Sequence, residues 1–345
     1  MGGGARGRAA QRRPAARVSG AFDGKSAGPR RGDRHRGLVL EGFRAREALD
    51  AERVRTTPRG HYEGQPGFRL LSPTTGALDT AEVAEQASVD PDQTLALLAD
   101  MAAAADRQMA ALAARLAGRL ALDLARAGAS SAGGVGRLEP GRADLCSGDI
   151  DIDRSLDGLL EARAAGRAAA LDELWVQRWQ RPATAITLVV DRSGSMGGPR
   201  LAAAAVAAAA CALRAPQQWS ALAFGDQVVA IKSADRDRPA PAVVDDVLRL
   251  RGYGTTDLAA ALDAARAQLE RCTARRRIAV LLSDCRATAG GDPLAAARRL
   301  DELCVIAPAG DAADAEAFAA AAGARFAAIA GPRSIPDAVA TVLEG

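Results

Sequence analysis

The second half of the chain alternates between short apolar runs and longer amphipathic stretches. Several of the apolar runs, such as residues 278–282, contain no polar position, which is typical of a mainly parallel sheet covered by helices on both faces. Strands are predicted at Ala185–Asp191, Trp219–Phe224, Val228–Lys232, Ile278–Ser283, Leu303–Ala307 and Arg325–Ala330. Helices are predicted at Arg200–Leu213, Ala242–Leu250, Leu258–Arg271, Pro293–Leu300, Ala312–Ala322 and Ile335–Leu343. Residues 183–345 are therefore expected to form a doubly wound α/β domain with a mostly parallel, six-stranded, Rossmann-like sheet.

A very short link, Gly225–Gln227, joins the second predicted strand to the third. A connection of this length cannot contain a crossover helix, so the two strands are expected to form a hairpin. One edge strand of the otherwise parallel sheet is therefore predicted to run antiparallel to its neighbour.

Residues 76–130 are predicted to form a helical region. A short helix is expected over residues 79–87, and Asp90 followed by Pro91 is typical of the start of another helix. Apolar residues then recur at steps of three and four as far as Gly128, which predicts one long amphipathic helix, on the order of 50 Å in length. The apolar stripe consists of Leu95, Leu98, Met101, Ala105, Met109, Leu112, Leu116, Leu120 and Leu124. This stripe is expected to pack either on the protein's own second domain or on a partner or second copy.

Residues 131–182 are interpreted as a linker and an extension. The linker, SSAGGVGRLEPG, is rich in glycine and serine. Asp149, Asp151 and Asp153 then alternate as in a calcium-binding EF-hand loop, but an arginine and a leucine stand where that loop needs its glycine and its glutamate. The favoured interpretation is an extended acidic segment in which Asp153 or Ser155 caps a helix over residues 156–166.

Residues 1–75 are expected to be a disordered basic tail. They show little apolar periodicity and much glycine, proline, arginine and serine. Residues 1–60 hold 15 Lys and Arg against 6 Asp and Glu, whereas the whole chain has a net charge of only +3. Arginine clusters bind phosphate readily, but the tail offers few aromatic side chains for stacking, so a nucleic-acid partner is not expected.

The remaining composition limits the class of protein. With 48% of its residues apolar, the chain can fill a core. The five cysteines are odd in number and widely spaced, which favours reduced thiols over a disulfide framework or a zinc site. No secretory signal is recognised, and the longest apolar run, from Leu201, is mostly alanine and too short to span a membrane. A cytoplasmic protein without a membrane partner is therefore expected.

Oxygen-bearing side chains stand at the carboxyl ends of the predicted strands, where ligands bind in open α/β sheets. Asp191 ends the first strand and is followed by Ser193 and Ser195, while Asp284 ends the strand IAVLLSD. The loop RGYGTTDL brings Thr255 and Thr256 to the start of a helix. Carboxylates and hydroxyls without a histidine or a thiolate form a hard-oxygen set, which selects Mg²⁺, Mn²⁺ or Ca²⁺ over zinc or copper.

The order of these elements resembles that of a known family. The motif DRSGSM at residues 191–196, the loop GTTDL and the strand-ending aspartate are similar to the metal-ion-dependent adhesion site (MIDAS) of von Willebrand factor A (VWA) domains. The resemblance covers residues 183–345. It implies that Ser193, Ser195 and Thr256 ligate the metal directly, and that Asp191 and Asp284 act directly or through water. The implied ion is Mg²⁺ or Mn²⁺.

Within that family, the stretch DELWVQRWQRPATAITLVVDRSGSM most resembles two groups. These are the bacterial VWA proteins encoded with MoxR-type AAA+ ATPases and the VWA domain of the magnesium-chelatase D subunit. The second group should carry an AAA+-like domain before the VWA domain, and no phosphate loop is found there in this chain.

The resemblance implies a non-enzymatic interaction module that binds an acidic residue of a protein partner, namely an AAA+ ATPase or its client. The alternative is a component of a magnesium-chelatase-like complex or a Mg²⁺-dependent hydrolase. Both histidines, His35 and His61, lie in the expected tail, so the folded half has no base for a Ser-His or Cys-His mechanism. Cys285 follows Asp284 directly, and this neighbour is expected to disfavour its thiolate.

Overall fold

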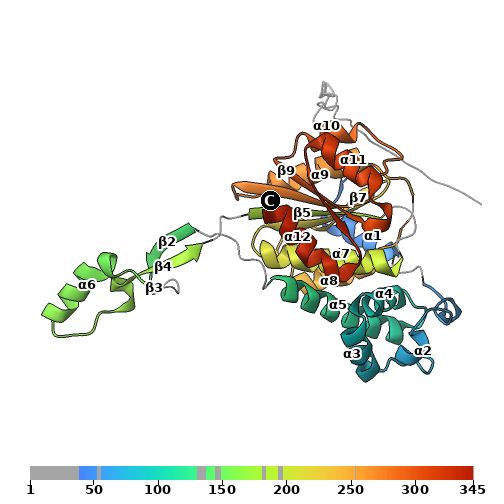
Figure 1. Cartoon of the computed structure of the whole chain (residues 1–345), viewed down its shortest axis with the longest axis horizontal. Coiled ribbons are helices and arrows are strands. Elements are labelled where there is room, and N and C mark those ends of the chain that lie inside the picture. Colours follow the sequence, from blue (N-terminus) through green and yellow to red (C-terminus); the bar gives the residue numbers. More distant parts are fainter. Residues whose placement is uncertain are drawn as a thin grey trace, which may run out of the picture.

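A seven-stranded sheet forms the centre of the protein (Figure 1). The computed structural model describes residues 39–52, 56–129, 137–143, 149–180, 184–192, 197–252 and 254–344. The sheet order is β1-β7-β6-β5-β8-β9-β10, and every neighbouring pair is parallel except β6 and β7. Its strands are β1 (Val39–Leu40), β5 (Thr184–Asp191), β6 (Trp219–Phe224), β7 (Val228–Lys232), β8 (Arg276–Leu282), β9 (Glu302–Pro308) and β10 (Arg325–Ile329).

The predicted fold class is confirmed, with two corrections to the sheet. The β6–β7 hairpin forms as expected, but β7 is not an edge strand because β1 pairs with it on the outer side. The sheet therefore has seven strands instead of six. The two residues of β1 are too few to show any alternation of polar and apolar side chains, so no pattern in the sequence could reveal them.

Helices cover both faces of the sheet, and each face has its own apolar core. Alternate residues along a strand enter different cores: Leu188 faces one and Val189 the other. On the first face lie α7 (Gly198–Arg214), α8 (Ala240–Leu248) and α12 (Ile335–Glu344) (Figure 1). On the second face lie α9 (Leu258–Leu269), α10 (Pro293–Ala297) and α11 (Ala313–Ala322). Most of α7 is buried alanine, whose small side chains let the neighbouring helices approach closely.

The helical region packs as an outer layer on α7. It comprises α3 (Thr80–Val89), α4 (Pro91–Met101) and α5 (Arg107–Ala129). The short predicted helix is thus confirmed, whereas the single long helix is wrong, because the chain breaks between α4 and α5. At the break, one carboxylate oxygen of Asp106 accepts hydrogen bonds from the backbone N–H groups of Gln108 and Met109 and so caps α5. Both α4 and α5 contact α7 of the same chain, so the apolar stripe packs on the protein's own second domain, the first of the two expected packing partners.

Part of the expected disordered tail is folded. Residues 39–75 contain β1, α1 (Gly42–Glu52), a 3₁₀ turn η1 (Arg59–His61) and α2 (Phe68–Leu71). Tyr62 and Phe68 are buried and stack with their ring centroids 5.7 Å apart. These two aromatic side chains give the segment a small apolar core that its overall composition does not predict. Residues 1–38 lie outside the described part of the chain.

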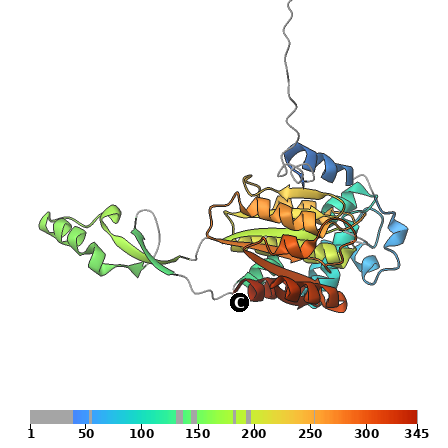
Figure 2. The same cartoon turned by 90° about the horizontal axis from the view of Figure 1, so that it is seen from above.

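A small module with its own sheet lies between α5 and β5 in the sequence. Strands β2 (Arg137–Arg142), β4 (Trp175–Gln180) and β3 (Asp149–Ile150) pair antiparallel in that order, and α6 (Ile152–Ala164) packs on β4. The module stands away from the main sheet in both views (Figures 1 and 2). The expected helix start is corrected: Asp151, not Asp153 or Ser155, caps α6 by accepting a hydrogen bond from the Arg154 N–H. No helix of the described residues is long and apolar enough to cross a membrane.

Asp100, in the last turn of α4, joins the helical region to the start of α7. Its side chain accepts a hydrogen bond from the backbone N–H of Gly198, and Gln65 Nε2 lies 3.4 Å from Asp100 Oδ2. Burial raises the pKa of the Asp100 carboxyl above its ordinary value. The two helices touch so closely here that a Cβ on Gly198 would lie 2.1 Å from the carbonyl oxygen of Ala96. The helical region therefore fixes the first turn of α7.

Replacing Asp100 by asparagine should change the pH dependence of stability. Because the pKa of Asp100 is raised in the folded state, its contribution to the free energy of unfolding is most favourable below pH 4 and is lost as the pH rises through the folded-state value. Asp100→Asn keeps an acceptor oxygen for Gly198 without the buried charge. We expect denaturant unfolding to show a gain of about 1 kcal/mol at pH 7 and a smaller gain at pH 4. An equal loss at both pH values would contradict this account, and the exposed Asp301→Asn is the matched control.

Candidate metal centre

Two of the predicted site residues, Asp191 and Asp284, lie at the ends of adjacent strands. β5 and β8 pair in parallel with Val190 opposite Leu282, so the next residues, Asp191 and Ser283, leave the sheet side by side. Asp191 is 9% exposed, and the side chain of Asp284 is 12% exposed. The strand register alone thus brings two carboxylates to one point of the sheet edge.

Ser283 is a site residue that the motif analysis did not single out. Its hydroxyl donates a hydrogen bond of 2.6 Å to Asp191 Oδ2 and accepts one of 2.9 Å from the backbone N–H of Cys285. Since the single hydroxyl proton goes to Asp191, the orientation of that carboxylate is fixed. The sequence signal was present, because Ser283 is a polar residue at the end of an apolar run, directly before Asp284.

Thr256 is held at the same edge by loops on both sides of β5. Its neighbour Asp257 donates its N–H to the carbonyl of Gly225, which follows β6, and its side chain caps α9 by accepting from Ala260. The carbonyl of Thr256 accepts hydrogen bonds from the N–H groups of Thr288 and Ala289, in the loop after β8. In the sheet β5 lies between β6 and β8, so Thr256 is placed over the end of β5.

The loop after β8 is closely packed against the Thr256 segment. Gly290 has a φ of +92°, and a Cβ there would lie 2.0 Å from Asp257 Oδ1. Only glycine fits both this backbone conformation and this contact. Thr256 itself is 3% exposed and does not line the pocket that Asp191 and Asp284 share. Ser193 and Ser195 lie outside the described residues, between Arg192, directly after β5, and Gly197 before α7.

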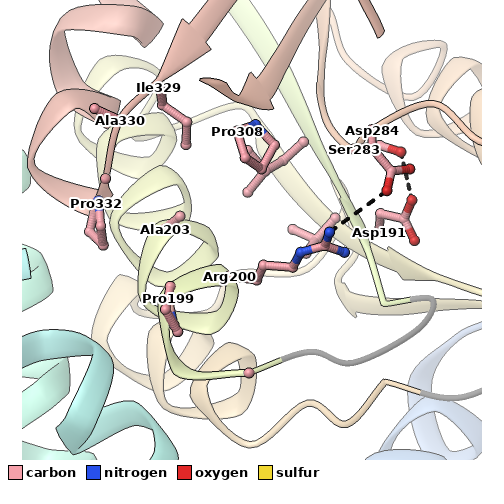
Figure 3. A pocket seen from close by; sticks show the side chains of 14 residues that line it. Asp191, Pro199, Arg200, Ala203, Ser283, Asp284, Pro308, Ile329, Ala330 and Pro332 are labelled. Atoms are coloured by element: carbon pink, nitrogen blue, oxygen red, sulfur yellow. Dashed lines mark hydrogen bonds and ion pairs between the residues drawn. The ribbon is translucent and has the colours of Figure 1, made fainter. Parts of the chain in front are cut away.

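A pocket of about 350 Å³ opens beside the two aspartates (Figure 3). It lies between the first turns of α7 and the carboxyl ends of β5, β8, β9 and β10. Asp191, Ser283 and Asp284 line one side, and apolar side chains line most of the rest. The arrangement is that of a ligand site in an open α/β sheet, with its polar groups gathered at one end.

Two arginines balance the negative charge around Asp284. Arg200 Nη2 lies 3.8 Å from carboxylate oxygens of both Asp284 and Asp311. Arg286 makes closer contacts, with its Nε 2.6 Å from Asp314 Oδ2 and its Nη2 2.5 Å from Asp311 Oδ1. Asp311 therefore already has a strong partner, and among the described residues Arg200 is the side chain that forms an ion pair with Asp284.

Cys285 turns the chain away from the site directly after Asp284. Its φ of 61° lies in the left-handed region, which is uncommon for a residue other than glycine. Burial, together with the charges of Asp284 and Asp191, raises the pKa of its thiol to about 12. The thiol is therefore protonated at neutral pH, in agreement with the expected suppression of its thiolate, and is a poor nucleophile.

The chemistry of the donor set fits a hard divalent cation. Asp191, Thr256 and Asp284 offer carboxylate and hydroxyl oxygens, the ligands preferred by Mg²⁺ and Mn²⁺. Across the part of the chain that the structure describes, no three His, Cys, Asp or Glu side chains gather in a way that could hold a metal ion. A site of this type instead depends on hydroxyl ligands in addition to its carboxylates.

Comparison with protein families identifies the chain. Residues 131–331, more than half of the sequence, match the model of the VWA domain containing CoxE-like proteins. The chain belongs to this family. The match begins before the module of β2, β3, β4 and α6, so in this CoxE-like protein the module is included in the family region together with the sheet strands β5 to β10. No curated protein matches the chain at a significant level.

Solved structures with similarity to this CoxE-like protein include other VWA domains. A von Willebrand factor type A protein from Catenulispora acidiphila shares 15% identity over 48% of this chain and 43% of its own, with a TM-score of 0.38. The manganese-loaded TRAP protein of Plasmodium vivax shares 18% identity over 46% of this chain and 72% of its own, with a TM-score of 0.37. The chain thus spans less than half of the first of these structures.

Removing the Ser283 hydroxyl should destabilise the protein. In Ser283→Ala, the Asp191 carboxylate loses this hydrogen bond and the Cys285 N–H loses the Ser283 hydroxyl as its acceptor, so we expect the free energy of unfolding to fall by about 1–3 kcal/mol. Urea denaturation followed by circular dichroism measures this loss. The control is Ser88→Ala, because the exposed Ser88 hydroxyl donates only to a carbonyl of its own helix. Equal stability of the two variants would show that the Ser283–Asp191 bond does not organise the site.

Proposed function

We propose that this CoxE-like protein is a metal-dependent interaction module that binds an acidic side chain of a protein partner. The observation that supports the proposal best is the pairing of β5 with β8, which puts Asp191 and Asp284 at one edge of the sheet beside an open pocket. The position of Thr256 over the end of β5 adds a hydroxyl at the same edge.

The proposed ligands follow from the motif and its place in the fold. Ser193, Ser195 and Thr256 would bind the ion directly, and Asp191 and Asp284 would bind it directly or through water. The ion would be Mg²⁺ or Mn²⁺. With neutral hydroxyls as its main ligands, such an ion keeps most of its positive charge and attracts an external carboxylate oxygen.

The protein itself would supply the rigidity of the site. Ser283 holds Asp191 in one orientation, and the loops after β6 and β8 hold Thr256. Asp100 fixes the first turn of α7, which follows the two serines in the chain. A site held in this way loses little conformational entropy when a partner binds.

The proposed partner is an AAA+ ATPase of the MoxR type or a client of that ATPase. The support is membership of the CoxE-like family, together with the resemblance of the sequence to VWA proteins encoded with such ATPases. A chelatase-like or hydrolytic role remains the alternative. Among the described residues, the ionisable side chains that line the pocket are Asp191, Arg200 and Asp284, and none of them is an evident general acid, so this lining does not favour the alternative.

Loss of the two serines should abolish metal-dependent partner binding. We expect wild type to retain an AAA+ ATPase or its client from native cell extract in Mg²⁺ but not in EDTA, as measured by quantitative mass spectrometry. Ser193→Ala/Ser195→Ala should reduce the retained amount at least tenfold in Mg²⁺. The control variant, Ser88→Ala/Thr341→Ala, removes two exposed hydroxyls from α3 and α12 and should behave as wild type.

Docking through the metal is wrong for this protein if wild type and the double serine variant retain the same proteins both with and without metal. The binding surface would then have to be sought elsewhere in the chain.

A further inference from the structure

The pocket beside the aspartates has an apolar half that the metal site does not use. It is lined by Pro199 and Ala203 from α7, Pro308 at the end of β9, and Ile329 and Pro332 around the end of β10 (Figure 3). Leu282 and Val190 complete this lining at the sheet. At about 350 Å³ the pocket is at the small end of the usual range for ligand sites, with room for one or two aliphatic side chains.

Arg200 stands between the apolar half and the two aspartates (Figure 3). Its side chain is 39% exposed, and its contacts with Asp284 and Asp311 at 3.8 Å are too long to be hydrogen bonds. A guanidinium has five N–H donors in a planar fork that matches a carboxylate. Arg200 can therefore bind an incoming carboxylate, by donating hydrogen bonds to it, at the border of an apolar pocket.

Charge balance explains why Arg200 would turn to a ligand only in the metal-loaded state. Among the described residues, Arg200 forms an ion pair with Asp284, whereas Asp311 is held more closely by Arg286. A divalent ion bound at Asp284 would take over the neutralisation of that carboxylate and repel the guanidinium. Arg200 would then keep only Asp311, which it shares with Arg286, and a carboxylate that reaches the ion would arrive within its range.

We propose that the site recognises an internal Asp or Glu of a partner polypeptide that has an aliphatic residue directly beside it. The aliphatic side chain enters the apolar half of the pocket, one carboxylate oxygen faces the metal, and Arg200 donates to the other. This inference rests on the proposed metal-dependent docking and specifies which acidic residues are accepted. An anionic ligand without an apolar group would leave the apolar half in contact with water, and an apolar ligand without a carboxylate would leave Arg200 unmatched.

The test uses defined peptides on the full chain. Fluorescein-labelled seven-residue peptides carry a central Asp, glycines elsewhere, and either Leu or Ser immediately after the Asp, with amidated carboxyl ends. Two further peptides place Leu or Ser immediately before it. Fluorescence anisotropy in Mn²⁺ and in EDTA measures the Kd of each. We expect the better Leu peptide to bind about tenfold more tightly than its Ser counterpart, and only in Mn²⁺.

Variants of the pocket test the location of the preference. Ala203→Leu fills the apolar half from α7, and Ala330→Leu, at an exposed position on the rim, covers it from the other side. In both, the Leu peptide should bind no more tightly than the Ser peptide. Arg200→Ala should weaken all metal-dependent binding by about three- to tenfold. Ala320→Leu, which adds the same side chain on the exposed surface of α11, should leave the preference unchanged.

The outcomes separate the two proposals. Binding of both Leu and Ser peptides that requires Mn²⁺ but shows no preference would overturn the pocket and leave the docking site standing. Circular dichroism melts check that Ala203→Leu and Ala330→Leu are folded. If the Leu preference survives in both variants and at least one of them is folded, the pocket proposal is also overturned. A further Leu peptide is made with a free carboxyl end, and binding of that peptide but of none of the amidated ones would assign the site to chain termini and overturn the proposal. No Mn²⁺-dependent binding of any acidic peptide would remove the docking function and the pocket together.

Discussion

The parallel pairing of β5 with β8 is the constraint on which the candidate site depends. Because Val190 lies opposite Leu282, the last residues of the two strands emerge together, and the hydrogen bond from Ser283 to Asp191 closes the pair. The arrangement needs no long-range electrostatic attraction, which is important because two neighbouring carboxylates repel each other. Sheet hydrogen bonds and two apolar cores supply the free energy that holds these like charges side by side.

Other parts of the chain hold Thr256 and the first turn of α7, which β5 and β8 do not position. The loops after β6 and β8 enclose Thr256, and the approach of Gly290 to Asp257 leaves no space for a side chain at residue 290. On the opposite side, α4 packs on the first turn of α7 so closely that Gly198 can have no side chain. The helical region is thus part of the support of the site, and a partner that moved α4 would act directly on the segment that follows the two serines.

The strands and helices of the VWA sheet could be predicted because their apolar runs and helical periods are long. The break between α4 and α5 could not, since alanines such as Ala105 suit a continuous helix as well as a turn, and only the capping by Asp106 decides. The folding of residues 39–75 depends on a few tertiary contacts, such as Tyr62 on Phe68, which cannot be predicted from composition. Asp191, Thr256 and Asp284 could be found from their motif, whereas the role of Ser283 required the strand register.

The most direct test of the account is the binding of Mn²⁺ to the purified chain, followed by electron paramagnetic resonance of the free ion. We expect wild type and the exposed control Asp301→Asn to bind one Mn²⁺ per chain. Thr256→Val and Asp191→Asn, which keep the shape of each side chain but remove a ligand oxygen or its charge, should bind at least tenfold more weakly. Equal Mn²⁺ affinity of Asp191→Asn and wild type, or no binding by wild type, would contradict the assignment of a metal centre to this edge of the sheet.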